Sequence, residues 1–179
     1  MTLEQKYKEL CDTPSDIYMH LPKLREYASK CEHVTEMGFR TGVSTFALLA
    51  GAPKKLVSYD IDFCPEWENI YKYAEKEGAI FLFINASVLD VEIEQTDMLL
   101  IDTWHTGTQC AQELQLHAGK VNKYLVFHDV EVNWQVGEDG GQENGLKYAI
   151  EPFMASHKEW KEIYRTDINH GLLILERVC

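Results

Sequence analysis

Four side chains that can bind a cation or move a proton follow two short apolar runs of the sequence. Asp102 and His105 come after one run, and His128 and Asp129 come after the next. Carboxylate oxygens favour Mg²⁺ or Ca²⁺, whereas imidazole nitrogens favour Mn²⁺, Zn²⁺ or Fe²⁺, so these residues could share one divalent cation. Such a cation lowers the pKa of a bound hydroxyl, and His105, whose ordinary pKa is ~6.5, can accept a proton near neutral pH.

A second group of residues forms a glycine-containing turn. Gly38 and Gly42 lie four positions apart, and Ser44 and Thr45 then open a predicted helix. A glycine allows positive φ and has no Cβ to keep a ligand away, and the start of a helix presents free N–H groups. We therefore expect a ligand to approach this turn closely, and a valine at either glycine to block its binding while the fold stays intact. A tight turn that only caps the helix is the alternative.

An acidic residue follows the glycine turn at a suggestive distance. Asp60 ends the next apolar run, 22 residues beyond Gly38 and 18 beyond Gly42. A carboxylate ~20 residues past such a turn can accept hydrogen bonds from the hydroxyls of a ribose. The pair of signals predicts a nucleoside site, although a lone Asp at a strand end is usually only solvated. An NAD-linked dehydrogenase is the weaker interpretation, because the third glycine of its fingerprint is absent.

Together these residues resemble the class I S-adenosylmethionine-dependent methyltransferases. Their first motif is an acidic residue, a hydrophobic residue and then G-x-x-x-G, which Glu36-Met37-Gly38 to Gly42 resembles, with Asp60 as the ribose acid. The small members similar to catechol O-methyltransferase and the cephalosporin hydroxylase-like group look nearest, and the resemblance covers nearly the whole chain. It implies that S-adenosylmethionine is bound by Glu36, Gly38, Arg40, Gly42, Ser44, Thr45, Asp60, Ser87, Asp102 and Trp104.

The resemblance also implies roles for two later segments. Asn85-Ala86-Ser87 resembles the turn that contacts adenine in this superfamily. Asp102-Thr103-Trp104-His105 resembles a stretch of the catechol enzymes in which the Asp binds a metal, the Trp packs on adenine and the next basic residue is the general base. By this resemblance, the catalytic residues are His105 and Asp102.

A metal site is implied by the same comparison. His128-Asp129 resembles the segment that carries the second metal-binding carboxylate, so the expected ligands are Asp102, His128 and Asp129, holding Mg²⁺ or another divalent cation. The catechol pattern continues with Asn where this chain has Val130, although Asn133 or His128 could substitute for it. A metal-free site, in which Asp102 contacts the cofactor and Asp129 caps a loop, therefore remains the alternative.

The elements that must position these residues alternate between strands and helices. Short runs of mostly apolar residues, typical of strands buried on both faces, occupy 33–37, 55–59, 79–84, 98–101 and 124–127. Helical segments lie before and between them, at 3–11, 21–30, 44–49, 66–77 and 107–117. This alternation predicts βαβ units with a parallel sheet, in which ligands bind at the carboxyl ends of the strands.

The last third of the chain departs from the alternation. A helix is predicted over 143–157, and two strands over 160–165 and 171–177 are joined by a short turn, which makes them antiparallel. The expected fold is a Rossmann-like class I methyltransferase sheet of about seven strands, mostly parallel, with a C-terminal antiparallel hairpin and helices on both faces. We interpret residues 1–179 as one domain, which consists of N-terminal helices (1–31), cofactor-binding βαβ units (32–130), a lid loop (131–142), and a helix with the hairpin (143–179).

The acceptor of the proposed reaction would meet two further segments. The glycine-rich acidic stretch 131–142 has the length of a lid, and Trp134 in it either covers an apolar substrate or only packs locally. The N-terminal region around Tyr18, His20 and Leu21 is the other candidate for contacts with the acceptor. The histidines outside the candidate cluster have no partner pattern, and we expect surface or core roles for His20, His33, His117, His157 and His170.

Composition limits the class of partner. The 179 residues carry 17 Lys and Arg against 29 Asp and Glu, a net charge of −12, which disfavours nucleic acid and anionic membranes. No apolar run approaches the ~20 residues of a membrane span, and the start MTLEQKYKEL is polar. Five scattered cysteines fit a reducing compartment, so we expect a cytoplasmic protein. We also expect a small-molecule substrate, and a homo-oligomer is compatible with the sequence.

The sequence thus predicts an enzyme that transfers a methyl group from S-adenosylmethionine to an oxygen, or less readily a nitrogen, of a small molecule, either with assistance from a metal or at a metal-free site. The alternative is a domain that binds S-adenosylmethionine or a nucleoside and has altered or no methyl-transfer activity.

Overall fold

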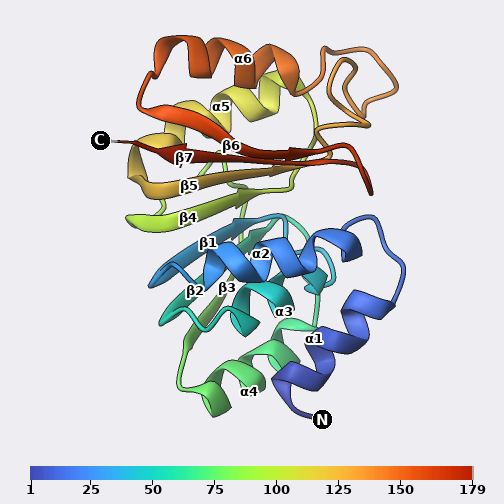
Figure 1. Ribbon diagram of the computed structural model, residues 1–179, viewed down its shortest axis with the longest axis vertical. Helices are drawn as coiled ribbons and strands as arrows, with labels where there is room; N and C mark the ends of the chain where they lie inside the picture. The colour runs from blue at the N-terminus through green and yellow to red at the C-terminus, as the bar shows by residue number, and fades with distance from the viewer. Residues whose placement is uncertain (179) are drawn as a thin grey trace.

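The computed structural model describes residues 1–178, which form one seven-stranded sheet in the order β3-β2-β1-β4-β5-β7-β6 (Figure 1). Strands β1 to β5 are parallel, and β7 lies antiparallel between β5 and β6. The strands are β1 (His33–Met37), β2 (Lys55–Asp60), β3 (Ile80–Asn85), β4 (Thr96–Ile101), β5 (Val121–His128), β6 (Trp160–Thr166) and β7 (Leu172–Arg177). The predicted fold, with its terminal antiparallel hairpin, is confirmed.

Helices cover the two faces of the sheet. One apolar core lies between the sheet and α1 to α4, and a second lies between the sheet and the pair α5 and α6 (Figure 1). The helices are α1 (Leu3–Asp12), η1 (Tyr18–His20), α2 (Leu21–Ala28), α3 (Val43–Ala50), α4 (Trp67–Glu77), α5 (Gly107–His117), η2 (Ala118–Lys120) and α6 (Lys147–Ser156). No helix within residues 1–178 is long and apolar enough to cross a membrane.

Local sequence explains where several helices begin and end. Thr2 and Gln5 form a reciprocal capping box at the start of α1. Gly42, in the left-handed conformation, precedes α3, and the Thr106 side chain caps α5. α6 begins at Lys147, four residues later than predicted, because the chain just before it pairs with the preceding loop through Asn144.

The connection from β3 to β4 contains no helix, so one face of the edge strand β3 has little cover. Ile80 and Leu82 on this face are 57% and 43% exposed, whereas Phe81 on the opposite face is buried. The candidate residues lie in the loops that follow β1, β2, β4 and β5, or at the last positions of these strands. These carboxyl ends share one edge of the sheet, where ligands bind in folds of this type.

Candidate functional site

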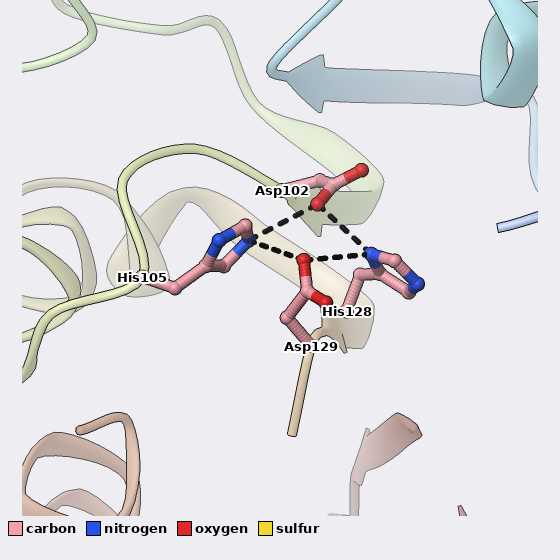
Figure 2. Close-up of side chains that lie close together, drawn as sticks. All are labelled: Asp102, His105, His128 and Asp129. Carbon is pink, nitrogen blue, oxygen red and sulfur yellow. Dashed lines mark hydrogen bonds and ion pairs between the residues drawn. The ribbon is translucent and has the colours of Figure 1, made fainter. Parts of the chain in front are cut away.

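The residues at the ends of β4 and β5 form one compact cluster (Figure 2). The Nε2 atom of His105 lies 3.1 Å from Oδ1 of Asp102 and 3.1 Å from Oδ2 of Asp129. The Nδ1 atom of His128 lies 3.1 Å and 3.2 Å from the same two oxygens. One donor atom from each of the four side chains lies within 4.8 Å of the others, so β4 and β5 bring together the residues that the sequence analysis grouped.

Contacts behind the cluster fix its imidazole and carboxylate groups. Nδ1 of His105 contacts the carboxylate of Glu138, in the loop before α6. Nε2 of His128 lies 3.1 Å from the backbone oxygen of Asp16, and the outer oxygen of Asp129 lies 2.8 Å from Nδ1 of His170. In each ring of the cluster, the nitrogen that faces away has its own partner, so the other nitrogen is directed inward.

The charges of the cluster shift the pKa values of its members. Burial disfavours ionisation of Asp102, but hydrogen bonds from His105 and His128 outweigh it and hold the pKa of this carboxyl well below its usual range. Burial also disfavours the imidazolium forms, yet the hydrogen bond and charge of Asp102, together with the charge of Asp129, raise the pKa of His105 to about 8 and that of His128 to about 10. At neutral pH, two imidazolium charges therefore balance two carboxylates.

This donor set fits a divalent cation. Two carboxylate oxygens and two imidazole nitrogens converge, and a cation with two charges can replace the two imidazolium protons without changing the net charge of the cluster. The partners behind His105, His128 and Asp129 match the pattern seen around metal ligands, in which the second ring nitrogen or carboxylate oxygen is held by a hydrogen bond. The nitrogen donors favour Mn²⁺, Fe²⁺ or Zn²⁺ more than an all-oxygen site does.

A cavity of about 450 Å³ lies beside the cluster and shares Asp102 with it. It is bounded by the turn after β1, by the ends of β2 and β4, by the segment after β3 and by the first turn of α5. Six of the predicted cofactor residues line it, namely Gly38, Arg40, Asp60, Ser87, Asp102 and Trp104. The sequence analysis did not assign the six other lining residues to the cofactor site, namely Tyr59, Ile61, Asp62, Val88, Thr103 and Gln109.

The Asp60 carboxylate is held at the rim of this cavity. Its Oδ2 accepts a hydrogen bond from the backbone N–H of Arg40 at 2.6 Å, and its Oδ1 accepts one from the backbone N–H of Asp62 at 2.9 Å. The Arg40 side chain, whose residue has φ 48°, reaches the carboxylate of Asp16. The glycine turn is thereby fixed both to β2 and to the N-terminal segment.

The remaining predicted cofactor residues lie behind the cavity wall. Glu36 is fully buried, and its carboxylate accepts hydrogen bonds from Ser44 (2.6 Å), Thr45 (2.7 Å) and Ser58 (2.5 Å). Burial outweighs these three hydroxyls and raises the pKa of Glu36 to about 7. These side chains join β1, β2 and α3 and so position the turn, but they do not line the cavity.

Gly38 is needed for the fold itself, which the sequence-based expectation did not foresee, whereas Gly42 is less constrained. A Cβ at Gly38, where φ is +97°, would lie 1.8 Å from the backbone oxygen of Asp102. A Cβ at Gly42, where φ is +77°, would lie 2.5 Å from the end of the Ile70 side chain. A valine at Gly38 would collide with backbone, so we no longer expect Gly38→Val to stay folded. At Gly42 the nearest atom is the end of a flexible side chain, so the expectation that Gly42→Val stays folded remains a prediction.

The loop before α6 is fastened to the cluster rather than open. Glu138 contacts His105 through its side chain and, through its backbone N–H, donates to the His105 oxygen at 3.3 Å. Trp134 packs against the core beneath α5 and α6, and the guanidinium of Arg165 lies 3.9 Å from its ring centroid. Of the two interpretations of Trp134, the geometry favours local packing.

Two histidines that the sequence analysis assigned to surface or core roles adjoin the cluster. His170 contacts Asp129, and its ring stacks parallel to that of His128 at 6.1 Å. His20 is buried with its ring 5.5 Å from that of His128. Both come from segments far away in the sequence. The region around His20 was already a candidate for contacts with the acceptor, whereas only the fold could identify His170. His33, His117 and His157 bond backbone oxygens elsewhere, as expected.

Comparison with known proteins supports the fold. No family model and no curated protein matches the sequence. Among solved structures, an O-methyltransferase from Bacillus cereus in complex with S-adenosylhomocysteine matches with a TM-score of 0.66 at 14% identity, over 98% of this chain and 90% of that one. The 1,6-didemethyltoxoflavin-N1-methyltransferase from Burkholderia thailandensis matches with a TM-score of 0.65 at 14% identity, over 96% and 82%. The N-methyltransferase NodS from Bradyrhizobium japonicum matches with a TM-score of 0.63 at 14% identity, over 99% of each chain.

The fold is therefore that of the class I methyltransferases. The similar structures include enzymes that methylate oxygen and enzymes that methylate nitrogen, so the fold alone leaves the acceptor atom open.

Proposed function

We propose that this chain is an S-adenosylmethionine-dependent methyltransferase that acts on a hydroxyl oxygen of a small molecule, with a divalent cation held by Asp102, His128 and Asp129. The observation that carries the proposal is the shared position of Asp102, which lines the cavity and also belongs to the four-residue cluster. A donor in the cavity and an acceptor at the cluster would meet at this residue.

The cavity wall offers groups for each part of the cofactor. Gly38 brings bare backbone to the cavity at the position proposed for the methionine portion. The free lone pairs of Asp60 can accept from ribose hydroxyls, and the exposed ring of Trp104 can stack on adenine. The solved relatives with bound S-adenosylhomocysteine support this choice of cofactor.

The chain's own residues orient the acceptor and remove its proton. S-adenosylmethionine supplies an electrophilic methyl group, and a divalent cation at the cluster supplies charge that lowers the pKa of a hydroxyl. His105 faces the same two carboxylates and, once neutral, can accept the hydroxyl proton at Nε2. Glu138 holds the ring by its other nitrogen, so that a proton gained at Nε2 is stabilised by a nearby carboxylate.

A small molecule suits the region around the cluster better than a polymer does. The segment before α2 and the turn before β7 close over His128, since Asn169 accepts from the backbone of Met19 and donates to the backbone of Ser15. The net charge of −12 opposes binding to nucleic acid. The free cysteines Cys11, Cys31, Cys64 and Cys110 are consistent with action in the reducing cytoplasm.

Calorimetric titration of the full chain with S-adenosylhomocysteine, with and without Mn²⁺ or Mg²⁺, tests the proposal. We expect binding in the micromolar range, followed by methylation of members of a panel of catechols, phenols and other hydroxyl compounds. Absence of nucleoside binding would reject the proposal. Binding without methylated product across the panel, with and without metal, would favour a nucleoside-binding domain without transferase activity.

A further inference from the structure

A buried carboxyl group lies directly behind the proposed adenine end of the cavity. Glu113, on the inner face of α5, is 0% exposed. Its Oε1 accepts hydrogen bonds from the hydroxyl of Thr103 at 2.5 Å and from the side-chain amide of Gln109 at 2.8 Å. Its Oε2 is also buried and has no hydrogen-bond partner among residues 1–178.

This arrangement is costly for a side chain that only supports a helix. Burial raises the pKa of Glu113 to about 7, and the two hydrogen bonds do not offset it. An apolar residue of similar volume would avoid both the desolvation and the unpaired oxygen. Both donors to Glu113 line the cavity, together with Ser87 and Trp104. The carboxyl group of Glu113 therefore fixes the orientation of two side chains in the wall of the cavity.

The direction of the Gln109 amide follows from the chemistry of its partner. An ionised carboxylate can only accept hydrogen bonds, so the NH₂ end of the amide must face Glu113. The carbonyl end is then left without a partner among the described residues, on a side chain that lines the cavity. An outward carbonyl accepts a hydrogen bond from an amino group and repels a carbonyl oxygen.

We propose that Glu113 is a positioning residue that holds the carbonyl of Gln109 toward the cavity, and that Gln109 thereby selects a nucleobase with an exocyclic amine. The inference rests on the proposed function and adds the origin of its base specificity. Adenine carries such an amine, whereas hypoxanthine carries a carbonyl at the same position. Thr103, fixed by the same oxygen of Glu113, keeps this wall and the adjacent Trp104 in place.

The test compares the binding of two probes to the full chain at pH 8, S-adenosylhomocysteine and its deaminated analogue, in which hypoxanthine replaces adenine. We expect the wild type to bind the adenine form at least tenfold more tightly. In Glu113→Gln, the new amide can donate as well as accept, so the Gln109 amide can turn, and the preference should fall at least fivefold. A residue with a purely structural role would weaken both probes by the same factor.

Two further variants keep the test decisive. Gln109→Met removes the carbonyl and should also reduce the preference, and it serves alone if Glu113→Gln does not fold. Gln112→Met, at an exposed position of the same helix, should leave the preference unchanged. Equal binding of both probes by the wild type, or an unchanged preference in folded Glu113→Gln and Gln109→Met, overturns this inference alone. Failure of the wild type to bind either probe overturns the proposed function as well.

Discussion

His105 faces two possible duties at one nitrogen atom. Its Nε2 lies 3.1 Å from a carboxylate oxygen of both Asp102 and Asp129, a position from which it can bind a cation or accept a proton, but not both at once. The two roles affect different quantities. If His105 is a metal ligand, it affects the affinity for the cation, whereas if it is a base, it affects the rate at which the acceptor is deprotonated. Substitution of this residue separates the two roles.

If His105 is the base, His105→Ala should lower kcat at least 100-fold while the affinity for S-adenosylhomocysteine changes less than about threefold, because general base catalysis contributes on the order of 10²–10⁴ to the rate. Steady-state kinetics and calorimetry on the same preparation give both quantities. His157→Ala, on a histidine that bonds the Phe153 oxygen in α6, is the matched control. An unchanged kcat in His105→Ala would remove this residue from the base role.

If Asp102, His128 and Asp129 hold a cation, the cation should also raise the free energy of unfolding. A cation that binds the folded cluster but not the unfolded chain stabilises the fold by an amount that grows with the logarithm of its concentration relative to its dissociation constant. Mn²⁺ at 100 times its dissociation constant should therefore add about 2.7 kcal/mol to the free energy of unfolding of the wild type. Thermal unfolding of His128→Ala should show a gain reduced by at least half. An equal gain in both proteins would place the cation elsewhere.

At the scale of elements, the turn between β6 and β7 holds the N-terminal segment over the cluster. Asn169, at φ 44°, bonds the backbone of Ser15 and Met19 with its side chain, and its own backbone oxygen lies 2.8 Å from Nε2 of His20. Consecutive residues with positive φ at 169 and 170 show that this turn is strained, and its contacts compensate the strain.

Asn169→Gly should keep the backbone conformation of the turn and remove its side-chain contacts. We expect faster amide hydrogen exchange in residues 15–20 and a higher KM for the acceptor, with little change in cofactor affinity, because neither Asn169 nor residues 15–20 line the cavity. Asp167→Ala, at an exposed position of the same turn, is the control. Unaltered exchange in residues 15–20 would show that other contacts hold the segment.

The two faces of the edge strand β3 should differ in how much their side chains contribute to stability. Phe81 faces the core with α3 and α4, whereas Leu82 faces the side that no crossover helix covers and is nearly half exposed. Phe81→Ala should cost about 3–5 kcal/mol of unfolding free energy. Leu82→Ala, its neighbour on the other face, should cost less than about 1 kcal/mol, and urea unfolding of the two variants measures the difference. Equal losses would indicate that the Leu82 face is covered in solution.

Local pattern predicted the elements well where each strand is buried on both faces. The predicted 33–37 and 107–117 match β1 and α5, because their boundaries are set by residues within a few positions, such as the Thr106 cap. The strict alternation of strands and helices does not hold between β3 and β4, where the connection contains no helix. The placement of β7 between β5 and β6 could not be predicted from local pattern, because the pairing of distant strands depends on which edge of the sheet is free.

Some residues of the candidate site could also be predicted from local sequence, and others could not. Residues at the end of a strand or directly after it, such as Asp60 and Asp102, could be predicted because the carboxyl ends of parallel strands share one edge. Glu113 and His170 could not be predicted, because no local sequence pattern indicates that the helix or turn that carries each of them packs against the site. Gly38 was correctly singled out, but its reason was misread: the lack of a Cβ allows contact with the backbone of Asp102 rather than only with a ligand.

For the molecule as a whole, the raised pKa values of buried groups make the fold less stable as pH rises, while burial lowers the pKa values of His20 and His117 and so acts in the opposite direction. Glu36 and Glu113 have pKa values raised from 4.5 to about 7 in the folded state, so between these values the folded chain binds more protons than the unfolded chain. His128, raised from 6.5 to about 10, does the same at higher pH. The contribution of these three groups to the free energy of unfolding therefore falls as pH rises from about 5 to 9. The depressed pKa of Asp102 acts oppositely only in strong acid, where its protonation destabilises the fold.

The metal-free protein should therefore be most stable in mildly acidic solution, which urea unfolding at pH 5, 6, 7 and 8 can measure. A rise of the Glu113 pKa from 4.5 to about 7 corresponds to at most about 3 kcal/mol lost across this range, so Glu113→Gln should flatten the curve by up to that amount. Glu68→Gln, on the exposed face of α4, controls for the change in net charge and should leave the slope unaltered. Stability that instead rises steadily from pH 5 to 8 would mean that these carboxyl groups ionise freely in the folded chain, and that Glu113 is reached by water.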